Sequence, residues 1–174
     1  MNSTVQTLIE RRSVKKYLPK PVERELIDLV VTAGTYAPTG RNRQPVKILV
    51  VTDTQVRDEL RKLNAKIMGV DENFDPFYGA PVVAVVLADP TVNTYLYDGS
   101  LVMGNMLNAA HALGFGACWI HRAKEAFQTE YGKSLLKQLG IDGEWEGIGH
   151  CVLGYTDGPL PKASLRKDGW VHYV

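Results

Sequence analysis

Apolar and polar residues alternate along the chain with two periods, one typical of helices and one typical of strands. Spacings of three and four between apolar residues predict helices over residues 3–10, 22–33, 54–63, 97–113 and 123–139. Short apolar runs predict buried strands at residues 46–51 and 80–88 and further strands at residues 116–120 and 148–155, and residues 170–174 are strand-like. We expect Ser3 to cap the first helix and Gly114 to end the fourth.

The fourth predicted helix and the last twenty residues both suggest contact with a second chain. Residues 97–113 are apolar on several sides, which is typical of a helix at the centre of a fold or at a subunit interface. The tail contains Pro159 and Pro161 and ends in the strand-like residues 170–174. Such a tail frays unless it docks, and the sheet edge of a partner subunit is one candidate.

The size of the chain predicts a single domain over residues 1–174, because 174 residues with 45% apolar content can form one sizeable core. The net charge of +1 gives no general reason to bind nucleic acid or an anionic membrane. Residues 1–47, however, hold nine basic and four acidic residues, whereas residues 48–154 hold eight and thirteen. This distribution indicates a local site for one anionic ligand.

The start of the chain and its apolar runs favour a cytoplasmic protein. No basic region followed by an apolar stretch is seen at the amino terminus, so no secretory signal is expected. The longest apolar run, residues 80–88, is far shorter than the roughly 20 residues needed to span a bilayer. Cys118 and Cys151 lie in strand-like surroundings and are interpreted as reduced core thiols.

The sequence lacks several common catalytic motifs. The glycine pairs at residues 114–116 and 147–149 lack the third glycine of a dinucleotide-binding fingerprint, and residues 132–134 lack the first glycine of a phosphate loop. The four histidines are dispersed without a zinc-binding spacing, and no serine has the glycine neighbours of a hydrolase elbow. We therefore expect no metal site and no protein nucleophile.

The cluster Arg11-Arg12-Ser13-Val14-Lys15 is the main candidate binding site. Guanidinium groups and a hydroxyl suit a phosphate group, because charged donors make short, strong hydrogen bonds to its oxygens. A mononucleotide cofactor fits this set of donors. The alternative is a solvated basic turn at the end of a helix.

Four segments together make the chain resemble the FMN-dependent nitroreductase family in its short form. They are Glu10–Tyr17, Ala37–Pro45, Phe77–Pro81, and His111–Gly116 leading into Cys118–Ile120. The resemblance implies an α+β fold, a nitroreductase-like α/β sandwich whose central mixed, mostly antiparallel sheet is flanked by helices. It also implies a homodimer with an exchanged C-terminal strand and two FMN molecules at the interface.

The family's activity would make this chain an NAD(P)H-dependent flavin oxidoreductase. NADH or NADPH would pass hydride to N5 of FMN, and an electron-poor acceptor such as a nitroaromatic or quinone would then take the electrons. The chemistry would belong to the flavin, so no catalytic side chain is required. Two alternatives stay open: a flavin-binding or storage protein with little turnover, and another flavin reductase such as a dehalogenase or ene reductase.

The resemblance assigns the basic cluster residue by residue. Arg11 and Ser13 would hold the FMN phosphate, Arg12 the phosphate or the ribityl chain, and Lys15 the N1/O2 edge of the flavin ring. In the family, a loop contacts the flavin of the opposite subunit. The residues of this chain that match it are Pro38, Thr39, Asn42 and Gln44. Dimerisation would then be a condition of activity.

Two further segments complete the predicted site. The segment whose backbone passes flavin N5 matches Trp119, Ile120, His121 and Arg122. The expected contribution is the main-chain N–H of about His121, and a general-acid role for its imidazole is the weaker interpretation. Arg166 and Lys167 match a basic pair that closes over the phosphate, and either could make the contact. The chain lacks a long helical insertion found in larger relatives, which predicts an open substrate pocket.

Overall fold

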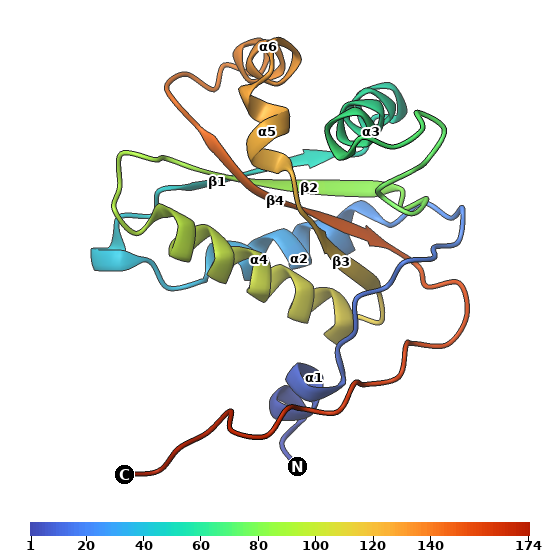
Figure 1. The fold of residues 1–174 in the computed structure, drawn as a ribbon, viewed down its shortest axis with the longest axis vertical. Coiled ribbons are helices and arrows are strands. Elements are labelled where there is room, and N and C mark those ends of the chain that lie inside the picture. Colours follow the sequence, from blue (N-terminus) through green and yellow to red (C-terminus); the bar gives the residue numbers. More distant parts are fainter.

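Four strands form one sheet in the computed structural model, which describes residues 1–174 (Figure 1). The strands are β1 (Val46–Val51), β2 (Val82–Ala88), β3 (Gly116–Ile120) and β4 (Glu146–Gly154). Their order is β1-β2-β4-β3, and all neighbours are antiparallel. The only parallel pairing is the isolated bridge between Ser13 and Ala117 at the β3 edge. The mostly antiparallel sheet is therefore confirmed.

Helices cover both faces of this sheet. They are α1 (Ser3–Glu10), α2 (Arg24–Thr35), α3 (Thr54–Met68), α4 (Tyr95–Ala112), α5 (Ala123–Gln128) and α6 (Glu130–Gln138), with a short 3₁₀ helix η1 (Gly40–Asn42). Figure 1 shows α3, α5 and α6 on one face and α2 and α4 on the other. Helix α1 lies beyond α4, on the α4 side of the sheet. No helix is both long enough and apolar enough to cross a membrane.

Strand β2 explains the long apolar run of the sequence. All seven of its residues are buried, because β2 lies between β1 and β4 and has helices above and below. Val83 and Val85 belong to the core under α3, α5 and α6, whereas Val82 and Ala84 belong to the core under α2 and α4. The alternation of the two cores follows from the two-residue period of a strand.

The structure corrects two local predictions. Asn2, and not Ser3, caps α1, because the Asn2 side chain accepts a hydrogen bond from the Thr4 N–H at 2.9 Å. The single helix predicted over residues 123–139 is two helices that meet at Thr129, whose side chain caps α6 by accepting from Gly132 N–H. A capping threonine inside an otherwise periodic pattern is hard to recognise from spacing alone.

The C-terminal tail forms no strand in the single chain. Residues 158–174 are exposed and have no strand assignment, and Figure 1 shows them running from the sheet past α1. An extended segment needs a neighbouring strand for its backbone hydrogen bonds, and residues 170–174 have none within this chain. Exchange of this segment with a second subunit stays a prediction.

Candidate functional site

The segment that follows α1 docks against the free edge of β3. Val14 N–H donates to Ala117 O at 3.0 Å, and Leu18 N–H donates to Tyr155 O at 2.8 Å. Val14 is 2% exposed and anchors the segment in the core. The docking needs a glycine at position 116, because a Cβ there would lie 2.9 Å from the Val14 side chain. The burial of Val14 and the absence of a side chain at Gly116 therefore hold this segment at one corner of the sheet.

This docked segment carries three cations without carboxylate partners, Arg11, Arg12 and Lys15. Arg11 is half-buried and Lys15 is exposed, and neither takes part in an ion pair. The neighbouring Lys16, in contrast, pairs with Asp157 at 2.7 Å. Arg12 donates to the carbonyls of Ile9 and Arg11 at 2.7 Å each, so part of its guanidinium caps the end of α1. Arg11 and Lys15 are therefore the free cations of this corner.

Sequence reasoning missed Tyr78 and Cys118, which lie beneath these cations. Lys15 Nζ is 5.8 Å from the centroid of the Tyr78 ring. Burial raises the pKa of the Cys118 thiol, and a hydrogen bond with Ser13 and the charges of Lys15 and Arg11 partly oppose that rise. Tyr78 belongs to the recognised motif Phe77–Pro81, but its position under Lys15 depends on a backbone φ of 56° that no sequence pattern predicts.

The turn from β3 into α5 has two side chains that pack into the core. The Trp119 side chain packs toward the core under α2 and α4, and Ile120 lies in the opposite core, 5% exposed. With both side chains turned inward, mainly backbone groups are left to face a ligand at this turn. His121 is exposed, and Arg122 precedes α5 with a φ of 73° and a buried Nε that has no hydrogen-bond partner.

The predicted loop residues lie at the diagonally opposite corner of the sheet. Thr39 Oγ1 accepts from Gln44 N–H at 3.1 Å, and Gln44 Nε2 donates to Asn42 Oδ1 at 2.9 Å. Asn42 and Gln44 have positive φ angles, and both are exposed, as is Pro38. With about 4.8 Å between strands and about 3.3 Å per residue, this corner is on the order of 25 Å from Ser13.

The tail residues make no hydrogen bond or ion pair with the basic corner. Arg166 donates only to Ser164 O, at 2.8 Å from its terminal nitrogen, and Lys167 makes no hydrogen bond or ion pair. Both are exposed. Within one chain, the structure therefore brings Arg11, Ser13 and Lys15 to the strand β3 that leads into the Trp119–Arg122 turn, and it shows no bond from the Pro38–Gln44 loop or the tail to them.

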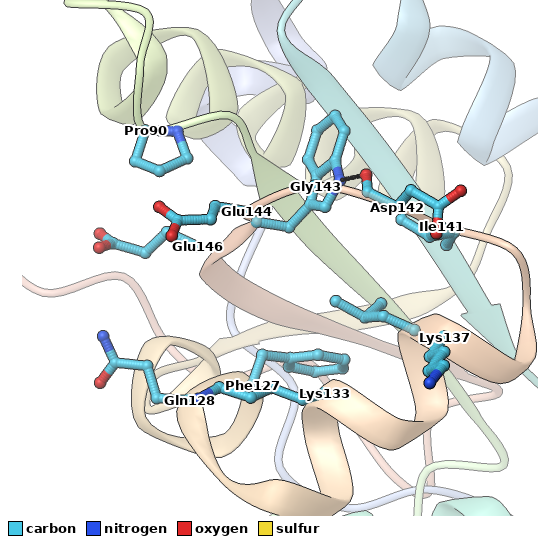
Figure 2. Close-up of a pocket in the computed structure, with 12 residues that line it drawn as sticks. Pro90, Phe127, Gln128, Lys133, Lys137, Ile141, Asp142, Gly143, Glu144 and Glu146 are labelled. Carbon is cyan, nitrogen blue, oxygen red and sulfur yellow. Dashed lines mark hydrogen bonds between the residues drawn. The ribbon is translucent and has the colours of Figure 1, made fainter.

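A cavity of about 550 Å³ lies away from the basic corner (Figure 2). It lies beside α5 and α6, and none of the predicted site residues lines it. Figure 2 shows Phe127 on its floor, with the carboxylates of Glu144 and Glu146 at one side. Because carboxylates and lysines share this cavity, it suits a phosphate less well than the corner of Arg11 and Lys15, two cations that have no carboxylate partner.

The corner of Arg11 and Lys15 fits the parts of a flavin mononucleotide. A phosphate needs cationic and hydroxyl donors, which Arg11 and Ser13 supply without a competing carboxylate. A flavin ring system needs a donor at its polar N1/O2 edge and a main-chain donor at its N5 edge. Lys15 and the backbone of the Ile120–Arg122 turn can supply these. The orphaned Nε of Arg122 is a further donor at this turn.

Comparison with known proteins identifies the family of this fold. The sequence profile of the nitroreductase family matches residues 8–155, which is most of the chain. The chain belongs to the nitroreductase family. The matched region contains all of the predicted site residues except Arg166 and Lys167, which lie in the tail beyond it.

Individual relatives give the same picture. A nitroreductase with bound FMN from Bacteroides fragilis superposes with a TM-score of 0.89 at 25% identity, covering 100% of both chains. An Archaeoglobus fulgidus protein named for NADH dehydrogenase/NAD(P)H nitroreductase activity is 30% identical over 89% of this chain and 86% of its own. An FMN reductase of Bacillus subtilis is 28% identical over 67% of this chain. The chain spans little more than half the length of several curated relatives it matches. The nitroreductase-like α+β fold is thereby confirmed.

Proposed function

We propose that this protein is an FMN-dependent NAD(P)H oxidoreductase. Relatives are named as NAD(P)H-dependent flavin oxidoreductases, and a structural neighbour of the same length holds FMN. The observation that carries the proposal is local. Two cations without ion-pair partners, Arg11 and Lys15, lie on the segment that docks on β3, beside the turn where the Trp119 and Ile120 side chains pack into the two cores.

In this proposal the basic segment holds the cofactor phosphate. Arg11 and Ser13 donate to the phosphate oxygens, and the bridge between Ser13 and Ala117 holds both donors against a rigid strand. Arg12 has terminal guanidinium donors committed to α1, so its remaining donors would serve the phosphate or the ribityl chain. A rigid donor set loses little conformational entropy when the anion binds.

Lys15 and the Trp119–Arg122 backbone would serve the reactive ring. When bound, FMN supplies the hydride transfer chemistry at its N5 atom, from NADH or NADPH to an electron-poor acceptor such as a nitroaromatic or quinone. Lys15 places a positive charge at the N1/O2 edge, where it stabilises developing negative charge. The main-chain N–H of His121 orients the ring from the N5 side.

We also propose that the active form is a homodimer, because one chain holds only part of the predicted site. The predicted loop lies at the corner of the sheet opposite to the basic segment of its own chain; it contains Pro38, Thr39, Asn42 and Gln44. A loop in that position would contact the cofactor of a partner subunit. Helix α1 has no buried residue, and its Leu8 and Ile9 are more than half exposed. The tail exposes further apolar side chains, and a partner subunit would cover both surfaces. Arg166 or Lys167 would then close over a phosphate.

The proposal is tested by the spectrum and reduction of the purified protein. We expect yellow protein with a flavin spectrum, and bleaching of the visible flavin absorbance after anaerobic addition of NADH or NADPH. Transfer to a quinone should restore the absorbance. A protein that retains FMN but bleaches with neither nicotinamide would be a flavin-binding protein without turnover. A protein that takes up no FMN would refute the cofactor assignment.

A further inference from the structure

The loop between α3 and β2 is organised by one residue, Asp75. Its Oδ1 accepts a hydrogen bond from the Phe77 N–H at 2.8 Å, and its Oδ2 accepts from the Gly79 N–H at 2.9 Å. Its main-chain carbonyl accepts from the Tyr78 N–H at 3.0 Å. Three successive N–H groups therefore donate to Asp75, and Tyr78 lies at the centre of them.

Arg57 of α3 holds this loop against the body of the protein. Its Nη2 donates to Asp75 Oδ2 at 2.6 Å, and its Nε donates to Ala80 O at 2.7 Å. The Arg57 and Asp75 side chains are 15% and 25% exposed, so solvent screens this pair less than an exposed ion pair. Phe77 is 0% exposed, and its ring packs 5.3 Å from the buried ring of His150. The loop is thus fixed at its two ends and at its base.

The conformation held in this way is unfavourable for a tyrosine. Tyr78 has a φ of 56°, in the left-handed region that glycine and asparagine adopt most easily. A strained residue of this kind persists only where the surrounding structure over-determines it, and such residues cluster at functional sites. The hydrogen bonds of Asp75 and Arg57 supply that constraint. The aromatic ring therefore calls for a function beyond closing the turn.

The contact between the Tyr78 ring and Lys15 indicates that function. Lys15 Nζ lies 5.8 Å from the ring centroid, within the about 6 Å over which a cation is attracted to an aromatic face. Lys15 is exposed and has no carboxylate partner, so the ring is the contact that restrains its ammonium group. The lysine stem is flexible, and without the ring the charge would be spread over many positions in solvent.

We propose that Asp75 is a positioning residue for Lys15. Through its hydrogen bonds to the backbone of residues 77–79 it holds the Tyr78 ring beside the Lys15 ammonium, which keeps that charge at the place assigned to the N1/O2 edge of FMN. This inference deepens the proposed function and rests on it. Asp75 acts on cofactor binding only through Tyr78 and Lys15, and this dependence separates its role from a general contribution to stability.

The test is a double-mutant cycle in the full-length protein. Asp75→Asn leaves one acceptor oxygen, which cannot serve two N–H groups and Arg57 together. Tyr78→Leu removes the aromatic ring, whereas Tyr78→Phe keeps its face. Asp75→Asn and Tyr78→Leu are each made in the wild type and in Lys15→Met. The measurements are the FMN dissociation constant, the midpoint potential of bound FMN, and amide hydrogen exchange of residues 77–79 in the FMN-free protein.

The matched control is Asp53→Asn. Asp53 also accepts from two backbone N–H groups, those of Gln55 and Val56 at 2.9 Å each, but it contacts no part of the loop beneath Lys15. The control therefore repeats the chemical change of Asp75→Asn at a different turn. We expect it to bind FMN as the wild type does.

We expect Asp75→Asn and Tyr78→Leu each to weaken FMN binding by about two- to fivefold, the factor that corresponds to one exposed cation–π contact. Both should shift the midpoint potential of bound FMN to a more negative value, because a charge fixed near N1 stabilises the reduced flavin. Asp75→Asn should also speed amide exchange at residues 77 and 79, and Tyr78→Phe should bind FMN as the wild type does. In Lys15→Met, neither Asp75→Asn nor Tyr78→Leu should weaken binding further.

Wild-type affinity or an unchanged potential in Asp75→Asn would overturn the inference. A loss of the same size in Lys15→Met would also overturn it, because the effect would then not pass through Lys15. If Asp75→Asn does not fold, the decision passes to Asp75→Glu, which keeps the charge but displaces both acceptor oxygens and must show the same loss and the same dependence on Lys15. Wild-type protein that binds no FMN, or Lys15→Met protein that binds FMN as tightly as the wild type, would instead refute the proposed function.

Discussion

Replacing Arg11 with alanine tests the phosphate assignment most directly. Arg11 lies at the end of α1, makes no ion pair, and is half-buried at the basic corner. A hydrogen bond to a charged group contributes about 1.5–3 kcal/mol, so the loss of this contact should weaken FMN binding by about 10- to 150-fold. The fold should be nearly unaffected, because surface substitutions usually change stability by less than about 0.5 kcal/mol.

The assay is titration of FMN-free protein with FMN, followed by quenching of flavin fluorescence, at two salt concentrations. Lys16→Ala is the matched control, because Lys16 is a neighbouring cation that is already paired with Asp157. We expect the control to bind FMN within about twofold of the wild type, since the Lys16 charge is neutralised locally. An Arg11→Ala protein with the affinity of the wild type, or a loss as large in Lys16→Ala, would refute the assignment of the phosphate to Arg11.

Three further outcomes follow from the structure. Removal of residues 159–174 should convert the proposed dimer into a monomer, as measured by sedimentation, and abolish FMN retention. A dimeric, yellow truncated protein would contradict the exchange of the tail. Gly147→Ala should lower the free energy of unfolding in urea by about 1–3 kcal/mol, because its Cβ would overlap the backbone of Ala123, and unchanged stability would mean that α5 can shift away from β4. Between about pH 7.5 and about pH 5 the wild type should lose about 2 kcal/mol of stability through His150, because the unfolded histidine takes up a proton that the folded one, with a pKa of about 4, does not. His150→Leu should lack this component, and an equally steep pH dependence in that variant would assign the loss to other groups.

The sequence predicted the elements whose signal is local. Strand β2 appears as an unbroken apolar run because both of its faces are covered, and α4 appears as a helix that is apolar on many sides because it lies against the sheet. The basic cluster was recognised because charge at a helix end is visible in one short segment. The boundary at Thr129 was missed because the helical period continues across the break.

The site could be predicted only as separate segments. Residues 11–15 and the turn after β3 are about a hundred positions apart, and their contact through the bridge of Ser13 and Ala117 depends on β3 being an edge strand. The same holds for Tyr78, which has a positive φ angle and lies under Lys15. Spacing predicts elements, whereas their assembly decides which side chains meet.

Helix α1 connects the two halves of the proposal. It has only eight residues, and an isolated helix of that length is unstable in water. None of its residues is buried in the single chain, so packing of the exposed Leu8 and Ile9 against a partner would add to its stability. The helix ends at the residue before Arg11. A partner that covers α1 therefore also fixes the backbone from which Arg11 and Ser13 extend. Dimerisation and cofactor binding would then stabilise each other through this one helix, and by thermodynamic linkage the effect must be equal in both directions.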